Sequence, residues 1–144
     1  MKNFTTGLYT HFTELIESAH NDFYTSVGGR MYYGERQSGS AFPCATFEIK
    51  SSTQDDSFTE DLAVIDIFFS LFSSDNDADE IMDMETYLKA LYKDCVFTVS
   101  DGTVASMSKV DSIGPYPVQG DNENAAEKYW QTDIVYEVVL VRSR

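Results

Sequence analysis

The sequence predicts an α+β fold: a single domain, 1–144, with a mostly antiparallel β-sheet and two helices packed on one face. Three observations support this prediction. At 144 residues the chain has the length of one domain, and no linker or internal repeat divides it. Runs of strand-like segments are flanked by two helix-like segments, which favours α+β over a regular alternation of strands and helices. The third observation is a long apolar strand, 60–72, that needs cover on both faces.

This strand is predicted to lie in the centre of the sheet, because nine of its thirteen residues are apolar. With a period of two, one face carries Ala63, Ile65, Ile67, Phe69 and Leu71. The other face carries Leu62, Val64, Asp66, Phe68 and Phe72. Helices are expected to cover one face, and either another part of the chain or a neighbouring subunit to cover the other.

Residues 3 to about 26 are predicted to form one helix, because apolar residues recur there at steps of three and four. Gly28 and Gly29 end it. A short strand is expected at 30–34, followed by a loop rich in Ser and Gly.

Pro43 opens a half-buried strand, 44–50, in which apolar and polar residues alternate. The polar, acidic residues 51–60 are interpreted as a connection, either a hairpin tip or an arm that extends toward a partner. The C-terminal half is predicted as a helix from a start signal at 73–80 to about Asp94, strands at 96–100 and 104–110 joined by the turn 101–103, a loop at 111–127, and a last strand at 129–141.

The charge excludes one class of function. The chain has 24 acidic and 10 basic residues and a formal net charge of −14, which argues against a protein that grips nucleic-acid phosphates. Cys44 and Cys95 lie outside any metal-binding spacing and are expected to be buried free thiols, with a disulfide between them as the alternative. The chain shows neither a signal peptide nor a membrane-spanning stretch, so we expect folding in a reducing cytoplasm and no contact with a membrane.

The sequence predicts no catalytic, cofactor-binding or metal site. Phosphate-binding loops and nucleophile elbows are absent, and His11 and His20 are interpreted as surface or packing residues. The alternating acids from Asp75 resemble a calcium loop, but its sixth and twelfth positions hold Glu80 and Thr86 instead of Gly and Glu. Asp66, an acid inside an apolar strand, is interpreted as meeting solvent or a partner's Lys or Arg.

Four pieces of sequence, in order, carry a resemblance to a known family. They are the segment 30–34 with the following Ala41-Phe42-Pro43, the acidic entry and apolar strand 60–70, the helix containing Tyr87-Leu88-Lys89-Ala90-Leu91-Tyr92, and the closing strand 130–138. Together they resemble the tail-completion, or tail-terminator, proteins of long-tailed bacteriophages and prophages over nearly the whole chain.

The resemblance implies a structural protein of the virion tail, made in the cytoplasm of the bacterial host, with no enzymatic activity. It implies a hexameric ring that caps the tail tube and offers a surface to which the head connector docks. The expected partners are copies of the same chain, the tail-tube protein and the head–tail connector protein, and DNA passes through the lumen without specific binding. The alternatives are a neck adaptor or tail-tube subunit, or a small acidic ligand-binding domain or enzyme that uses Asp66.

Acidity and the second apolar face fit such a ring. A negative lumen repels phosphates, and an exposed apolar face marks an interface. The long polar segments 51–60 and 111–127 are expected to reach toward the tail tube or the connector. The predicted interface residues are Leu62, Val64, Asp66 and Phe68 of the strand, and Asp55, Asp56 and Phe58 of the preceding segment.

Overall fold

The computed structural model has the predicted α+β fold, with a six-stranded sheet in the order β1-β2-β3-β6-β5-β4. It describes residues 2–14, 18–34, 41–56, 60–74, 78–93, 95–99, 102–119 and 128–143. The elements are α1 (Lys2–Thr13), α2 (Ser18–Ser26), β1 (Met31–Tyr33), β2 (Cys44–Asp56), β3 (Glu60–Ser73), α3 (Asp79–Leu91), β4 (Val96–Thr98), β5 (Val104–Gln119) and β6 (Lys128–Ser143).

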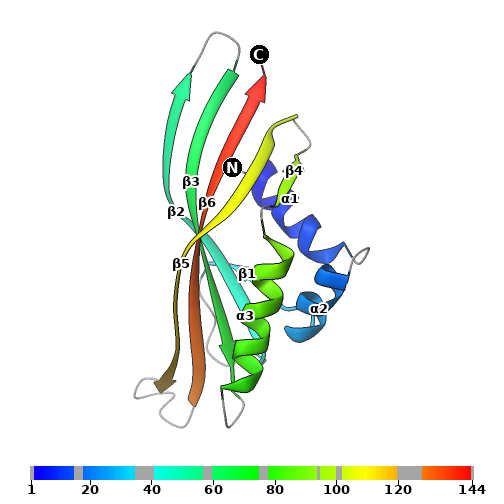
Figure 1. Ribbon diagram of the computed structural model, residues 1–144, viewed down its shortest axis with the longest axis vertical. Coiled ribbons are helices and arrows are strands. Elements are labelled where there is room, and N and C mark those ends of the chain that lie inside the picture. Colours follow the sequence, from blue (N-terminus) through cyan, green and yellow to red (C-terminus); the bar gives the residue numbers. More distant parts are fainter. Residues whose placement is uncertain are drawn as a thin grey trace.

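The sheet is antiparallel apart from the short pairing of β1 with β2. The three described helices lie on one face of this long, twisted sheet, and the β2–β3 hairpin projects past them (Figure 1). None of the described helices is long and apolar enough to cross a membrane. The structure therefore has the predicted arrangement of layers, with a third helix added.

Strand β3 is central, as predicted, between β2 and β6. Ile65, Ile67 and Phe69 are completely buried on the face that carries the helices. The intervening residues Val64 and Phe68 are only half-buried, because the opposite face has no helical layer in the described part of the chain. The alternation of β3 thus separates a closed face from one that is partly open to solvent.

The prediction of one helix over residues 3–26 is wrong, since α1 ends at Thr13 and α2 begins at Ser18. The Phe12 and Phe23 rings meet edge to face with their centroids 5.7 Å apart. In one straight helix two residues eleven positions apart would be roughly 16 Å apart along the axis. Splitting the helix lets both rings enter the same core, which is a tertiary gain that the helical period does not encode.

Parts of two segments predicted as connections are strands, which corrects the interpretation of residues 51–56 and 111–119, while residues 57–59 and 120–127 lie outside the described part of the chain. β2 continues to Asp56 opposite β3, and β5 continues to Gln119 opposite β6. Residues 51–56 have no apolar residue that could alternate with the polar ones, and the sequence Gly114-Pro115-Tyr116-Pro117 is typical of a loop, so neither pattern indicated a strand. Backbone pairing with a long neighbouring strand holds both segments, and register shifts such as the one at Ile49/Ser51 absorb the extra residues.

The periodicity of the sequence predicts a buried stripe of Ile81, Met84, Leu88, Leu91 and Cys95 for the third helix. The first four are buried in the helix, and Cys95 is buried just beyond its end. The helix ends at Leu91 rather than near residue 94, and it begins without a side-chain cap. The Ser73 hydroxyl instead donates a 2.6 Å hydrogen bond to Glu80 Oε1, which links the end of β3 to the first turn of α3.

The cysteines and one histidine lie as predicted. Cys44 and Cys95 are both buried free thiols. The His11 ring is a packing residue that lies between the rings of Tyr92, at 5.7 Å, and Phe97, at 5.8 Å. The side chain of His20 lies outside the described residues.

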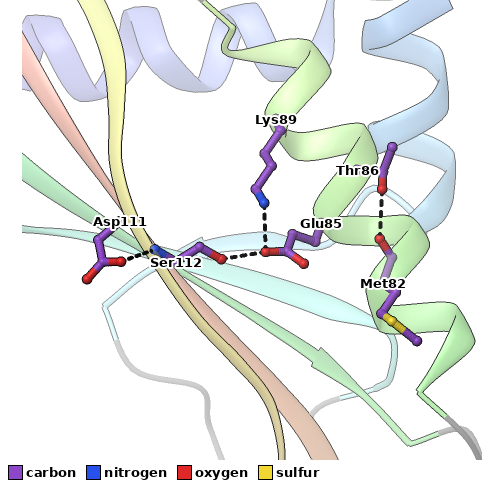
Figure 2. A network of polar contacts seen from close by, with 6 residues as sticks. All are labelled: Met82, Glu85, Thr86, Lys89, Asp111 and Ser112. Atoms are coloured by element: carbon purple, nitrogen blue, oxygen red, sulfur yellow. Dashed lines mark hydrogen bonds and ion pairs between the residues drawn. The ribbon is translucent and has the colours of Figure 1, made fainter.

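A polar network fastens α3 to the sheet (Figure 2). The Ser112 hydroxyl of β5 donates a 2.5 Å hydrogen bond to Glu85 Oε1, and Lys89 Nζ lies 3.0 Å from the same oxygen. Burial disfavours the charged form of Glu85, but the hydrogen bonds from Ser112 and Lys89 outweigh it, so the pKa of Glu85 falls below its ordinary value of 4.5.

We expect Glu85→Gln to lower the free energy of unfolding by about 1 kcal/mol at neutral pH, since it removes charge-assisted bonds. Because the folded-state pKa is lowered, the unfolded chain binds more protons between that value and 4.5. The contribution of the Glu85 carboxylate to stability is therefore complete above pH 4.5 and disappears as the pH falls through the folded-state pKa. Urea unfolding of both proteins across pH should show two curves that converge in acid, and a constant gap would contradict this origin.

Candidate interaction surface

The face of the sheet without helices is the candidate site, and we call it the open face. It is defined by the residues whose side chains alternate with the buried ones: Val64, Asp66, Phe68 and Ser70 of β3, Glu48 of β2, and Asp133, Val135, Glu137 and Val139 of β6. None of these nine side chains is fully buried. The open face is thus partly accessible to a partner.

The open face combines apolar pairs with carboxylates. Val64 lies opposite Val139, and Phe68 lies opposite Val135. Between these pairs, Asp66 lies directly opposite Glu137. Like charges at directly opposed positions disfavour a sheet, whereas the two apolar pairs favour burial against another surface. The open face therefore combines apolar surface with a pair of opposed carboxylates.

A hollow of about 420 Å³ lies at one end of the open face. Phe68, Phe72 and Tyr129 supply aromatic walls, and Glu48 and Asp133 supply carboxylates. Lys50 Nζ forms an ion pair with Glu48 and lies 5.8 Å from the centre of the Phe68 ring. The ammonium group of Lys50 therefore lies over an aromatic ring and beside a carboxylate at this hollow.

Asp133 holds the floor of this hollow together. Its Oδ1 accepts hydrogen bonds from the Ser70 hydroxyl at 2.7 Å and from Gln131 Nε2 at 2.9 Å. Its Oδ2 accepts one from the Tyr116 hydroxyl at 2.6 Å. Burial together with this bond raises the pKa of Tyr116 above its ordinary value. Three elements are thereby fixed around one carboxylate.

A glycine lets β5 come close enough for this contact. Gly114 has a φ of +113°, and a Cβ placed there would lie 2.8 Å from the backbone oxygen of Gln131. Only glycine combines that backbone conformation with so close an approach. The position of Tyr116 over Asp133 thus depends on a backbone feature two residues away.

The structure brings some predicted interface residues together and leaves others undescribed. Val64, Asp66 and Phe68 form one row on the open face, and Leu62 continues β3 opposite Val141. The side chain of Leu62 is not among those described. Asp55 and Asp56 extend β2 opposite Leu62 and Asp61, without described side chains, and Phe58 lies outside the described residues. Their role as an interface remains a prediction.

Sequence reasoning missed the Asp133 cluster. Gln131 and Asp133 are two residues apart in a strand, so their sharing one face was readable from the period. Tyr116 was not, because its segment was interpreted as a loop. Among the described residues no group of three His, Cys, Asp or Glu side chains is placed to hold a metal ion. Asp75 and Asp77 of the rejected calcium loop lie outside that part of the chain.

Comparison with known proteins finds a likeness among solved structures. No protein-family model matches the chain, and no curated protein sequence matches it. Among solved structures, the fold is similar to that of a chain in the virion of a native gene transfer agent particle, with a TM-score of 0.57 and 12% sequence identity. The likeness covers 83% of this chain and 84% of the other. The protein thus shares nearly its whole α+β architecture with a chain of a virion.

Proposed function

We propose that this protein is a structural component of a phage-like virion, and specifically a tail terminator that closes as a ring on the end of the tail tube. The observation that carries the proposal is the shared architecture with a virion chain, which extends over most of both chains. The ordered pieces of sequence that resemble tail-terminator proteins point in the same direction.

The open face supports a role in assembly. In a ring of identical subunits each copy uses two different surfaces, so the contact repeats head to tail until the ring closes. The half-buried row of Val64, Asp66 and Phe68 lies on a sheet face without helical cover, and burying it against the next subunit removes apolar surface from water. We assign this row to the subunit contact.

The net charge of −14 fits a ring through which a genome passes. Several copies of so acidic a chain repel phosphates from the walls of a lumen, so DNA slides through without specific binding. The tail-tube protein and the head connector are the expected partners at the two ends of the ring.

Light scattering over a range of protein concentrations, with electron microscopy of the same samples, tests the proposal. We expect closed rings of about six subunits, either free in solution or formed on the ends of tail tubes. Open tubes of indefinite length would instead assign the protein to the tail-tube class. A strict monomer that does not associate with tails would refute a role in the virion.

A further inference from the structure

The two ends of the sheet expose different outer edges. β1 covers β2 only from Ala45 to Phe47, and β4 covers β5 only from Val104 to Ser106. Beyond these pairs, no strand in the described part of the chain pairs with either edge. The remaining edge of β5 carries two prolines and two register shifts, which oppose strand addition, whereas that of β2 carries a single shift and no proline. β2 is therefore the edge suited to receive another strand.

The pairing with β1 shows which backbone groups of β2 point outward. The Ala45 N–H donates to Arg30 O at 3.0 Å, and Phe47 O accepts from the Gly34 N–H at 2.9 Å. Outward groups recur at every second residue. The register shift at Ile49/Ser51 inserts one residue, so beyond it Ser52 and Gln54 direct their N–H and C=O groups outward. They continue the line of bonds that β1 begins.

An apolar groove lies beside the point where β1 ends. Its volume is about 550 Å³, and it is lined by Thr5, Thr6 and Tyr9 of α1 and by Met31, Phe47 and Ile49 of the two strands. Because the groove adjoins the edge of β2, a strand added there has every second side chain directed toward the helix layer. Main-chain bonds along an edge with a pocket for alternate side chains define recognition by strand addition.

Charge selects the strand that binds. From residue 48 to residue 61 the sequence has five carboxylates and one lysine, and the whole chain carries a net charge of −14. A second copy would therefore bring like charge to this edge. A segment with lysine or arginine brings the opposite charge, which favours its binding and speeds its encounter.

We propose that the outer edge of β2 binds an extended segment of a different protein, in which basic residues alternate with apolar ones. One apolar side chain enters the groove beside α1, and the backbone pairs with Ser52 and Gln54. This surface is separate from the open face, and binding there does not require ring formation. It goes beyond the proposed function by giving the protein a second contact of defined chemistry.

Fluorescence anisotropy with a labelled peptide of alternating Lys and Val, about eight residues long to match the open edge, tests the proposal. Gln54→Pro removes one outward N–H without touching the pairing with β3, and Gln54→Ala keeps that N–H as its matched control. Thr6→Trp fills the groove from α1, and Thr6→Ala leaves it open. We expect Gln54→Pro and Thr6→Trp each to weaken binding about five- to tenfold, and both alanine variants to bind like the wild type.

Equal binding by Gln54→Pro and Gln54→Ala would refute strand addition, and equal binding of an alternating Glu and Val peptide would refute the basic partner. Light scattering of the same variants separates this contact from the ring. We expect Gln54→Pro to assemble like the wild type. If it fails to assemble although its unfolding is unchanged, the occupant of the edge is a second copy and the proposed partner is wrong.

Discussion

Phe68→Asp is expected to abolish ring formation and to leave a folded monomer. Phe68 lies opposite Val135 on the open face, and its ring is half-buried in the isolated chain. Aromatic residues at the centre of an interface contribute 2 kcal/mol or more, roughly, when truncated. An aspartate there would also bury an unpaired charge in the subunit contact, which costs several kcal/mol more, to order of magnitude. A ring repeats this loss at every contact.

The monomer itself should lose little stability. In the folded chain Phe68 contacts Lys50, an exposed cation–aromatic pair that is typically worth about 0.5–1 kcal/mol. Light scattering should show the mass of a single subunit, while circular dichroism should show the wild-type spectrum and a cooperative thermal transition.

Met82→Asp is the matched control for this change. It adds the same charge on the exposed side of α3, where Met82 is 44% exposed, away from the open face. We expect it to assemble normally. If Phe68→Asp still forms rings, the open face is not the subunit contact. If that variant unfolds globally, Phe68 belongs to the core of the monomer.

The sequence predicts those parts of the fold in which side-chain burial follows a regular period. The two faces of β3, the buried stripe of α3 and the final strand all have that property, and the structure contains them. The second halves of β2 and β5 do not, because pairing with their neighbours holds them in the sheet, and a backbone hydrogen bond leaves no trace in the residue pattern. The break between α1 and α2 depends on the contact between Phe12 and Phe23, which only the folded chain brings together.

The sequence likewise predicts one part of the candidate site and not the other. The row from Val64 to Phe68 was readable, because an apolar strand with one acid among its outward residues is a local pattern. The hydrogen bond between Tyr116 and Asp133 joins β5 to β6, and predicting it required the end of β5 and its register shift at Ile113/Tyr116. The residue period of a single strand cannot predict a contact that depends on the register between two strands.

Phe69→Ala is expected to destabilise the fold strongly, in contrast to the change at its neighbour. Phe69 is completely buried, and its ring stacks on Tyr92 at 5.2 Å and meets Tyr136 edge to face at 5.6 Å. Truncating a buried phenylalanine to alanine costs about 3–5 kcal/mol, since the lost transfer energy is joined by the cost of the cavity. The free energy of unfolding of a folded domain is roughly 5–15 kcal/mol in total, so the variant should be only marginally stable.

The cavity would also loosen the helices. The Tyr92 hydroxyl donates a 3.3 Å hydrogen bond to Leu8 O, so the ring that stacks on Phe69 also ties α3 to α1. For Phe69→Ala, urea unfolding should show a lower midpoint with an unchanged slope, and the shift should correspond to that loss of free energy. Phe69→Leu should cost less than about 1.5 kcal/mol, because leucine nearly fills the space. A small effect of Phe69→Ala would mean that the helices do not pack on this face of β3. Adjacent residues of one strand then separate the two surfaces: Phe69 holds the monomer together, and Phe68 is available to hold the ring.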